Sequence, residues 1–346
     1  MSRKKQGPQV VSREILETGS IIGHYEVIAL LGQGGYGDIY LVHFLNKTEK
    51  YALKCENLKS NKQGLQIEHN FLLSLQDSKC FPRIYDFGKT PQFLYIVMEV
   101  LGPSISNTRR QLPHHYFSLS TALRLGIFMI KCLQQFHNHG LVHRDVKPGN
   151  FLLRPNYKNP VTLIDFGLSR KFINPETLEP YPERKKCGFR GTSKYASITA
   201  HEEHDLCWRD DLISLMYSLV EMIRGKLPWS DRRDLDEVYQ YKKIMPPEDL
   251  FVDLPPCFLE IWNHLQTLRF ADPPDYQMMI SLFLSELKED EIAHPTPFDW
   301  ENLPEDQMKA FSPYVGLPKA SNTVLIDKSS SRSQSACCGS SACLLL

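Results

Sequence analysis

The sequence predicts an α+β fold in two lobes, a small β-rich N-terminal lobe with one main helix and a larger, mostly helical C-terminal lobe. Three observations support this prediction. Residues 25–54 have the pattern of three short strands, with a glycine-rich turn between the first two. The segments 121–136 and 211–224 are apolar over most of their surface, which is typical of interior helices. A length of 346 residues is sufficient for two lobes and a tail.

Composition narrows the class of protein. Apolar residues make up 42% and charged residues 23%, as in ordinary globular proteins. The 40 basic residues balance the 40 acidic residues, so net charge gives no reason to expect a nucleic-acid partner. No apolar run approaches the length of a membrane-spanning helix, and the N-terminus lacks the apolar core of a secretory signal. We therefore expect a cytoplasmic monomer with free thiols.

The chain divides into three parts at changes of composition. Residues 1–24 are polar and of mixed charge, and we expect a flexible leader there. Residues 25–298 form the folded domain, and residues 299–346 are predicted to be a disordered tail. Within the domain we expect an N-lobe over 25–98, a hinge over 99–103 and a C-lobe over 104–298.

The first predicted strand runs into Gly32-Gln-Gly34-Gly-Tyr-Gly37, and a second strand follows over 39–42. Glycines suit a turn where backbone N–H groups must approach phosphate oxygens, because no Cβ intervenes. In dinucleotide-binding folds glycines with this spacing open a helix. Here they connect two strands, and the segment resembles the phosphate-binding flap of protein kinases.

The third strand ends in Ala52-Leu-Lys54, which resembles the V-A-I-K motif of kinases, so Lys54 is expected to hold the α- and β-phosphates of ATP. Residues 62–75 have the pattern of a helix. Glu68 is the only acid in that run, and we expect it to pair with Lys54. The alternative is an ordinary solvated glutamate on the helix surface.

The buried strand 93–98 is broken by Glu99-Val-Leu-Gly102-Pro103, which predicts the hinge. Backbone groups of 99–101 are expected to face the adenine edge, and Met98 to close the back of the pocket. The predicted ATP site comprises Leu31, Gly32, Gln33, Gly34, Gly35, Tyr36, Gly37, Asp38, Ile39, Ala52, Lys54, Met98, Glu99, Leu101 and Leu152.

After the apolar helix 121–136 comes the octet His143-Arg-Asp145-Val-Lys147-Pro-Gly-Asn150, which resembles the H-R-D-L-x-x-x-N catalytic loop of protein kinases. Phosphoryl transfer needs positioning and charge stabilisation. In these roles Asp145 faces the acceptor hydroxyl, Lys147 lies near the transferring phosphoryl group and Asn150 holds a metal. Asp165-Phe-Gly follows 20 residues after Asp145, and Asp165 is predicted to bind Mg²⁺. The expected cofactors are ATP and Mg²⁺.

The segment after Asp165 lacks the A-P-E motif and reads Gly-Phe-Arg-Gly-Thr-Ser-Lys-Tyr-Ala-Ser-Ile over 188–198. This resembles the casein kinase I superfamily, and within it the tau-tubulin kinase branch. The resemblance implies a two-lobed protein kinase fold and Ser/Thr protein substrates. It also implies that Thr192 bridges Asp145 and Lys147 and that Asp211 holds the catalytic-loop backbone. Further matching segments are 98–104, 147–152, 209–212, 218–222, 227–229, 268–276 and 298–301.

The superfamily often prefers acidic or already phosphorylated substrates, and this chain has a basic cluster in the corresponding segment. Arg184, Lys185, Lys186, Arg190 and Lys194 lie within eleven residues that contain no acid. We predict an anion site for substrate at Arg190 and Lys194. The alternative is a basic loop that only contributes to solubility.

The sequence ends in Cys337-Cys338-Gly-Ser-Ser-Ala-Cys343-Leu-Leu-Leu, after a serine-rich stretch. The last four residues match C-a-a-X, and the terminal leucine predicts a geranylgeranyl group on Cys343. One prenyl chain binds membranes weakly, so Cys337 and Cys338 are expected to supply a second, palmitoyl signal. The protein would then lie at the cytosolic face of membranes. The alternative is a chance match at a disordered end.

The leading hypothesis is an ATP-dependent Ser/Thr protein kinase. A kinase-like scaffold (pseudokinase), tethered to membranes by the tail, is the alternative. Such scaffolds usually lack the equivalents of Lys54, Asp145 or Asp165, and all three are present here. A small-molecule kinase would lack a helix like 211–224 and a peptide-binding activation segment.

Overall fold

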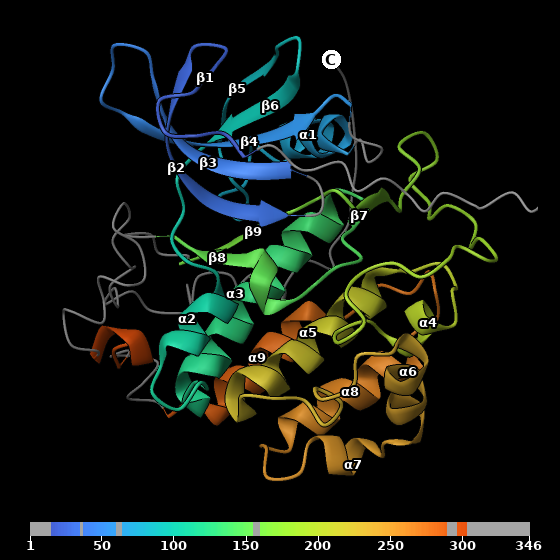
Figure 1. Cartoon of the computed structure of the whole chain (residues 1–346). Helices are drawn as coiled ribbons and strands as arrows, with labels where there is room; N and C mark the ends of the chain where they lie inside the picture. The colour runs from blue at the N-terminus through green and yellow to red at the C-terminus, as the bar shows by residue number, and fades with distance from the viewer. Residues whose placement is uncertain (1–14, 35–36, 60–63, 155–159, 289–295, 303–346) are drawn as a thin grey trace, which may run out of the picture.

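The computed structural model describes residues 15–34, 37–59, 64–154, 160–288 and 296–302. Within them the chain folds into the two lobes that the sequence predicts, one above the other (Figure 1). Five residues of the predicted sites lie outside the described part: Gly35, Tyr36, Cys337, Cys338 and Cys343. No helix in the described ranges is long and apolar enough to cross a membrane.

The upper lobe is one antiparallel sheet in the order β1-β2-β3-β4-β6-β5. Side chains alternate between its two faces. One face buries Tyr40, Val42, Leu53 and Val97 in a small core, and the other meets helix α1, which packs against β5 and β6. The elements are β1 (Ile21–Ile22), β2 (Tyr25–Gly34), β3 (Gly37–Phe44), β4 (Lys50–Asn57), α1 (Leu65–Ser74), β5 (Ile84–Lys89) and β6 (Phe93–Met98).

The folded part begins earlier than the sequence analysis predicts. Ile22 is buried and pairs with Tyr25 across a tight turn, which adds β1 to the sheet edge. The backbone N–H of Leu16 donates to the Tyr40 hydroxyl at 3.1 Å. Residues 15–24 therefore pack on the sheet and are not a free leader. Two isoleucines in a polar stretch are too short a pattern to predict a strand.

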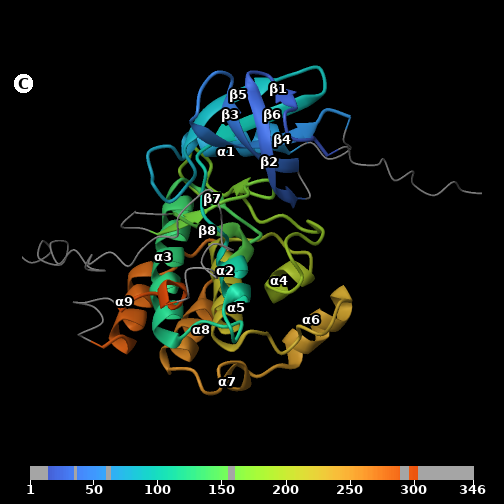
Figure 2. The same cartoon turned by 60° about the vertical axis from the view of Figure 1, so that its left-hand side comes forward.

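The lower lobe is built around two helices, α3 (Leu119–Asn138) and α5 (Trp208–Arg224), whose side chains are almost all buried. Ser118 caps α3 by accepting the N–H of Thr121 at 3.2 Å, and Gly225 ends α5 in the left-handed conformation. The surrounding helices are seen from two sides in Figures 1 and 2: α2 (Ile105–Gln111), α4 (Ile198–His201), α6 (Leu235–Ile244), α7 (Pro247–Leu250), α8 (Cys257–Thr267) and α9 (Tyr276–Glu286).

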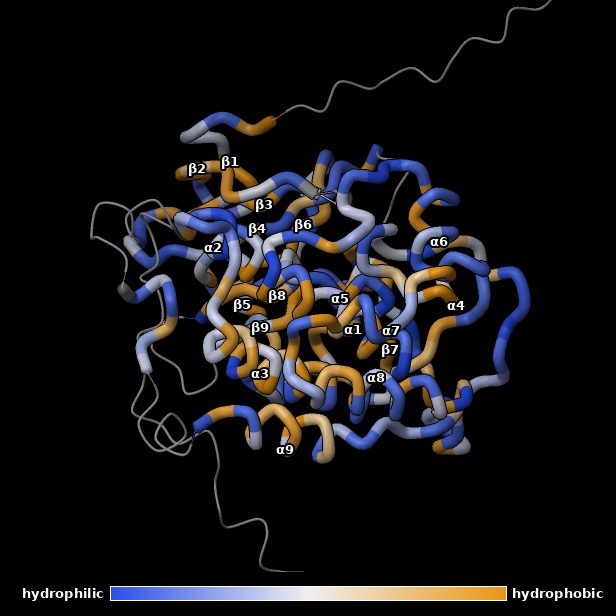
Figure 3. Tube along the Cα trace, turned by 90° about the horizontal axis from the view of Figure 1, so that it is seen from below, coloured by the Kyte–Doolittle hydropathy of each residue, from blue (hydrophilic) through white to orange (hydrophobic). Residues whose placement is uncertain are grey.

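Helix α9 lies at the edge of this lobe and carries both apolar and polar stretches (Figure 3). Its inner side buries Tyr276, Met279, Ile280 and Phe283, which is the pattern of an amphipathic surface helix. It therefore closes one side of the core that α3 and α5 form.

The folded part also ends later than predicted. The 3₁₀-helix η2 (Asp299–Asn302) follows the predicted boundary, and Trp300 is fully buried with its ring stacked on Phe298 at 4.6 Å. The Asp299 carboxylate accepts both the N–H and the hydroxyl of Ser118 at 2.7 Å. From the sequence, residue 299 was assigned to the tail because the stretch beyond it is polar. A polar sequence gives no sign that Trp300 packs on Phe298 or that Asp299 contacts Ser118.

Short elements between α3 and α4 lie beneath the sheet (Figure 1), and Asp145, Lys147, Asn150 and Asp165 lie on them or in the loops that connect them. The pair β8 with β9 forms the lower surface of the cleft between the lobes, and β7 pairs with β10 beside it. Their bounds are β7 (Leu141–Val142), η1 (Pro148–Asn150), β8 (Phe151–Leu153), β9 (Val161–Leu163) and β10 (Arg170–Lys171).

Candidate active site

A cavity of about 720 Å³ lies between the lobes. Strand pairing explains why the predicted residues meet there, because Ile39 pairs with Lys54 and Ala52 with Met98 in neighbouring strands. Asp38 is an exception, since its side chain is buried in β3 and does not line the cavity. The predicted ATP-site residues that line it are Leu31, Gly32, Gln33, Gly37, Ile39, Ala52, Lys54, Met98, Glu99, Leu101 and Leu152.

The Glu99 carboxylate has a structural role in this cavity wall. It accepts the backbone N–H of Arg83 at 2.9 Å and forms an ion pair with Arg154. Its backbone N–H donates to the Arg83 carbonyl at 3.0 Å. The side chain therefore anchors the hinge, as expected if only backbone groups there face a base.

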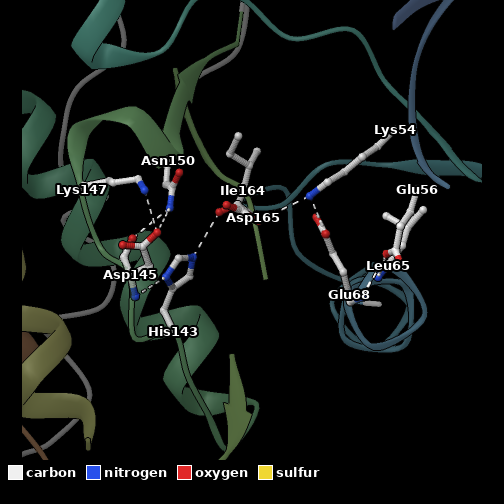
Figure 4. Close-up of polar contacts among 11 residues, drawn as sticks. Lys54, Glu56, Leu65, Glu68, His143, Asp145, Lys147, Asn150, Ile164 and Asp165 are labelled. Atoms are coloured by element: carbon white, nitrogen blue, oxygen red, sulfur yellow. Dashed lines mark hydrogen bonds and ion pairs between the residues drawn. The ribbon is translucent and has the colours of Figure 1, made fainter. Parts of the chain in front are cut away.

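The predicted pair of Lys54 and Glu68 is present. Lys54 Nζ lies 2.5 Å from Glu68 Oε2 and 3.4 Å from Asp165 Oδ1, as Figure 4 shows. Both Lys54 and Glu68 are buried. Burial alone would lower the pKa of Lys54, but the Glu68 and Asp165 carboxylates outweigh it and raise the pKa above its usual value. Lys54 is therefore a charged group held by two carboxylates at the cavity wall.

Asp145, Lys147 and Thr192 form a triangle on the lower side of the cleft. Lys147 Nζ donates to Asp145 Oδ2 at 2.7 Å and to Thr192 Oγ1 at 2.9 Å, and the Thr192 hydroxyl donates to Asp145 Oδ1 at 2.7 Å. The bridge that the family resemblance implies for Thr192 is thus present. It fixes the carboxylate of Asp145. It also links the catalytic loop to the activation segment, the stretch that follows Asp165 and includes residues 188–198.

Asn150 and Asp165 offer the oxygen donors that Mg²⁺ prefers. The Asn150 amide Nδ2 donates to the Asp145 carbonyl at 2.9 Å, which orients the side chain and leaves its Oδ1 as an acceptor. Burial would raise the pKa of Asp165, but Lys54 outweighs it and the pKa is lowered. One ionised carboxylate with one amide oxygen fits a cation that shares its remaining positions with phosphate. In the described ranges, no cluster of three or more His, Cys, Asp or Glu side chains could hold a metal ion.

His143 links Asp145 of the catalytic loop to Ile164, the residue before Asp165. Its Nδ1 accepts the backbone N–H of Asp145 at 3.3 Å, so its Nε2 carries the proton and donates to the Ile164 carbonyl at 3.1 Å (Figure 4). The neighbouring Phe166 ring is fully buried, 5.8 Å from the His143 ring and 5.3 Å from that of Phe136. Because Phe166 points inward, Asp165 points into the cleft.

Asp211, at the start of α5, holds the catalytic-loop backbone. Its two oxygens accept the N–H groups of His143 at 2.7 Å and Arg144 at 2.8 Å. Arg144 has a φ of 70°, a strained conformation that these bonds stabilise. His137 Nε2 donates to Asp211 at 2.9 Å, and the Tyr276 hydroxyl donates to His137 Nδ1 at 2.6 Å. These contacts of His137 and Tyr276 were not predicted from the sequence, because His137 lies in no recognised motif and the matching segment 268–276 does not indicate a partner for Tyr276.

The predicted anion site needs a correction at Lys194. Its ammonium pairs with Glu221, a buried residue of α5 that also accepts Tyr195 Oη at 2.6 Å and Arg109 Nη2 at 3.3 Å. Lys194 therefore attaches the activation segment to α5 rather than presenting a free charge. Arg190 is exposed, and its guanidinium contacts the Phe189 carbonyl at 3.0 Å.

A second buried carboxylate organises the start of the same segment. Asp205 is 1% exposed, forms an ion pair with Arg170 and accepts Arg184 Nη2 at 2.9 Å. Burial would raise its pKa, but the hydrogen bonds from Arg184 and Arg170 hold the pKa at about 2. Sequence reasoning missed both Asp205 and Glu221, because an isolated acid carries no local signal of a distant arginine.

Comparison with known proteins agrees with this geometry. The model of the protein kinase domain matches residues 25–279. A probable serine/threonine-protein kinase of Dictyostelium discoideum is 40% identical over 286 residues, which are 82% of this chain and 58% of that protein. The chain thus spans less than two-thirds of that relative.

The serine/threonine-protein kinase spe-6 of Caenorhabditis elegans is 31% identical over 320 residues, which are 88% of this chain and 84% of that protein. The two-lobed fold, the geometry of the cleft and these similarities all indicate the same family. The chain belongs to the protein kinase family, and both of these relatives are named as serine/threonine-protein kinases.

Proposed function

We propose that this protein transfers the γ-phosphate of ATP to serine or threonine hydroxyls of acidic or phosphate-primed protein segments. The observation that carries the proposal is the triangle of Asp145, Lys147 and Thr192 beside a cavity that holds Lys54 and Asp165. Each of these five side chains is hydrogen-bonded to a neighbour, which fixes its position.

Each group has a role that follows from its position. Asp145 accepts the hydrogen bond of the acceptor hydroxyl and takes its proton as the new ester bond forms. Lys147 balances the charge that develops on the transferring phosphoryl group. Lys54 holds the α- and β-phosphates, while Ile39, Ala52 and other apolar residues of the cavity cover the base. Asp165 and Asn150 would hold Mg²⁺, which would supply positive charge at the phosphate oxygens.

The acceptor class can be tested with three peptides of one sequence that differ only in a central Ser, Thr or Tyr. We expect labelled phosphate from ATP on the Ser and Thr peptides and none on the Tyr peptide. Equal labelling of the Tyr peptide would contradict the proposed acceptor class. ATP binding without transfer to any peptide would favour the scaffold alternative.

The preference for acidic segments is supported by the basic run 184–194 of the activation segment, which contains five basic residues and no acid. Asp205 and Glu221 are each matched by two cations, namely Arg170 with Arg184 and Arg109 with Lys194. Exposed Lys185, Lys186 and Arg190 add further positive charge with no carboxylate partner within the described residues.

The catalytic-loop residue Arg144 lies in this positive region. Its pKa is lowered to about 10, first by burial and then by the charges of Arg184 and Arg170. Burial is the main cause, and the further lowering shows that the guanidinium groups of Arg184 and Arg170 lie close enough to repel Arg144. A substrate phosphate or carboxylate would therefore be stabilised beside this surface.

Charge reversal of Arg190 tests this preference, and Lys194 is left unchanged because it has a structural partner. For Arg190→Glu we expect kcat/KM to fall about tenfold or more on a phosphoserine peptide and less than about twofold on a neutral peptide. Lys89→Glu, at an exposed lysine of β5, is the matched control. Equal losses on both peptides would contradict the anion site.

We also propose membership of the casein kinase I superfamily, closest to the tau-tubulin kinase branch. Its support is the segment 188–198, which departs from the A-P-E pattern. In the structure this segment supplies Thr192 to the catalytic triangle and Lys194 to Glu221. Membership of this superfamily would imply a phosphate-primed preference of the kind described above.

Lipidation of Cys343, with Cys337 and Cys338, stays a prediction of the sequence, because these residues lie outside the described ranges. We propose that it brings the kinase to the cytosolic face of membranes. Cys343→Ser should move the protein from the membrane fraction to the soluble fraction of a cell lysate. An unchanged distribution would contradict the proposal.

A further inference from the structure

Strand β4 carries a buried acid, Glu56, in addition to Lys54. Glu56 follows Lys54 by two residues, so both side chains extend from the same face of the strand. Glu56 is 5% exposed. A single oxygen, Oε2, accepts the backbone N–H groups of Gly64 at 2.9 Å and Leu65 at 2.8 Å (Figure 4).

These two N–H groups belong to the start of α1, the helix that bears Glu68. The first N–H groups of a helix have no partner within the helix and need an external acceptor. The N-cap residue of α1 is Gly64, which has no side chain to supply one. The Glu56 carboxylate replaces the missing cap from a neighbouring strand, and its negative charge suits the positive end of the helix dipole.

Helix α1 depends on such an attachment more than a long helix would. It has ten residues, and isolated helices of that length are marginal in water. Ile67 and Leu73 on its outer side are 50% and 60% exposed, so only part of its apolar surface is buried in the sheet. Strand β4 is therefore attached to α1 at two points. Glu56 accepts the first N–H groups of the helix, and Lys54 pairs with Glu68 one turn later.

We propose that Glu56 is a positioning residue of the kinase, which fixes the start of α1 so that Glu68 meets Lys54. The proposal rests on the proposed function for its activity readout, but its structural readout does not. Loss of the carboxylate should release α1 and lower transfer without removing any group that touches ATP.

Hydrogen–deuterium exchange of the full chain tests the attachment directly. In Glu56→Ala, amides of α1 should exchange about tenfold faster, which is the size of effect expected for loss of a helix cap. Glu56→Gln should stay close to the wild type, because both N–H groups use one oxygen and the amide of Gln retains one. Glu49→Ala, at an exposed glutamate just before β4, is the matched control and should leave α1 unchanged.

Wild-type exchange of α1 in Glu56→Ala would overturn the proposal, as would equally fast exchange in Glu56→Gln. If the Ala variant does not fold, Glu56→Asp is the second variant, since its carboxylate is one methylene too short to reach both N–H groups. Full protection of α1 in the Asp variant would also contradict the attachment.

A kinetic cycle separates positioning from a general loss of stability. We expect Glu56→Ala to lower kcat about tenfold in the wild type and less than about twofold in a Glu68→Gln background, because both changes act on the same ion pair. Independent, multiplicative losses would contradict the proposal. If the wild type transfers no phosphate, the proposed function fails while the exchange experiment still decides the role of Glu56.

Discussion

Replacement of Asp211 by Ala should damage catalysis although Asp211 touches neither ATP nor substrate. Its carboxylate is 1% exposed and accepts the N–H groups of His143 and Arg144 at 2.7 and 2.8 Å. Alanine leaves these two donors without an acceptor, and also the His137 Nε2–H, which donates to Asp211 at 2.9 Å. It also removes the restraint on Arg144, whose φ of 70° is unfavourable for a residue with a side chain.

The magnitude follows from these contacts. Each buried N–H without an acceptor costs about 1–3 kcal/mol, so three cost about 3–9 kcal/mol. Relaxation of Arg144 recovers about 1–2 kcal/mol, which leaves a net loss of about 2–7 kcal/mol and moves Asp145 with the loop. For a domain of this size the midpoint of thermal unfolding should fall by about 5–15 °C. A shift of Asp145 by about 1 Å should lower kcat about 100-fold.

Thermal unfolding and steady-state kinetics of Asp211→Ala measure both effects. Asp211→Asn retains one acceptor oxygen and should be intermediate in each. The neighbouring Asp210 is a matched control, because it is equally buried but accepts the N–H of Cys207 at 3.0 Å as a helix cap. Asp210→Asn should cost about 1 kcal/mol and leave kcat within about twofold. An Asp211→Ala protein with wild-type kcat would refute the argument.

Two further predictions concern the activation segment. Glu221→Gln leaves Arg109 and Lys194 without their carboxylate, so the free energy of unfolding should fall by about 2–3 kcal/mol, at the low end for a buried pair because Lys194 is 31% exposed. The KM for peptide should rise while the KM for ATP stays constant, and a rise in the ATP KM alone would contradict this. The pKa of His201 is lowered to about 4 by burial and then by Lys242. The unfolded chain binds the proton with a pKa of about 6.5, so stability should be complete above that pH and decline as pH falls towards 4. In His201→Gln, the midpoint of thermal unfolding should change less between pH 7 and pH 5 than in the wild type. Parallel plots of this midpoint against pH for the two proteins would argue against the prediction.

The reacting groups could be predicted from the sequence because their spacing is set by the chemistry. Lys54, Asp145, Asn150 and Asp165 each lie in a short motif, and their order along the chain fixes their roles. Glu68 could be predicted because it is the only acid in its helical run. The structure brings all five to one cleft, as these patterns indicate.

The supporting groups could not be predicted, since their partners are distant in sequence. Glu221 meets Arg109 across 112 positions, and the Lys194 pairing removes half of the predicted anion site. Glu56 is only eight residues from Gly64, but acceptance of a helix N–H by a strand carboxylate has no motif. The same holds for the fold, where apolar periodicity predicts α3 and α5 but not the two-residue strand β1.

Phosphotransferase activity of this chain is measured by transfer of labelled γ-phosphate from ATP to a casein-like peptide and to a phosphate-primed peptide. Wild type and Asp145→Asn are compared side by side, with ATP binding measured for both. We predict transfer by the wild type, preference for the primed peptide, and a loss of at least about 100-fold in Asp145→Asn with ATP binding retained. Equal transfer by both proteins, or none by the wild type despite bound ATP, would contradict the account.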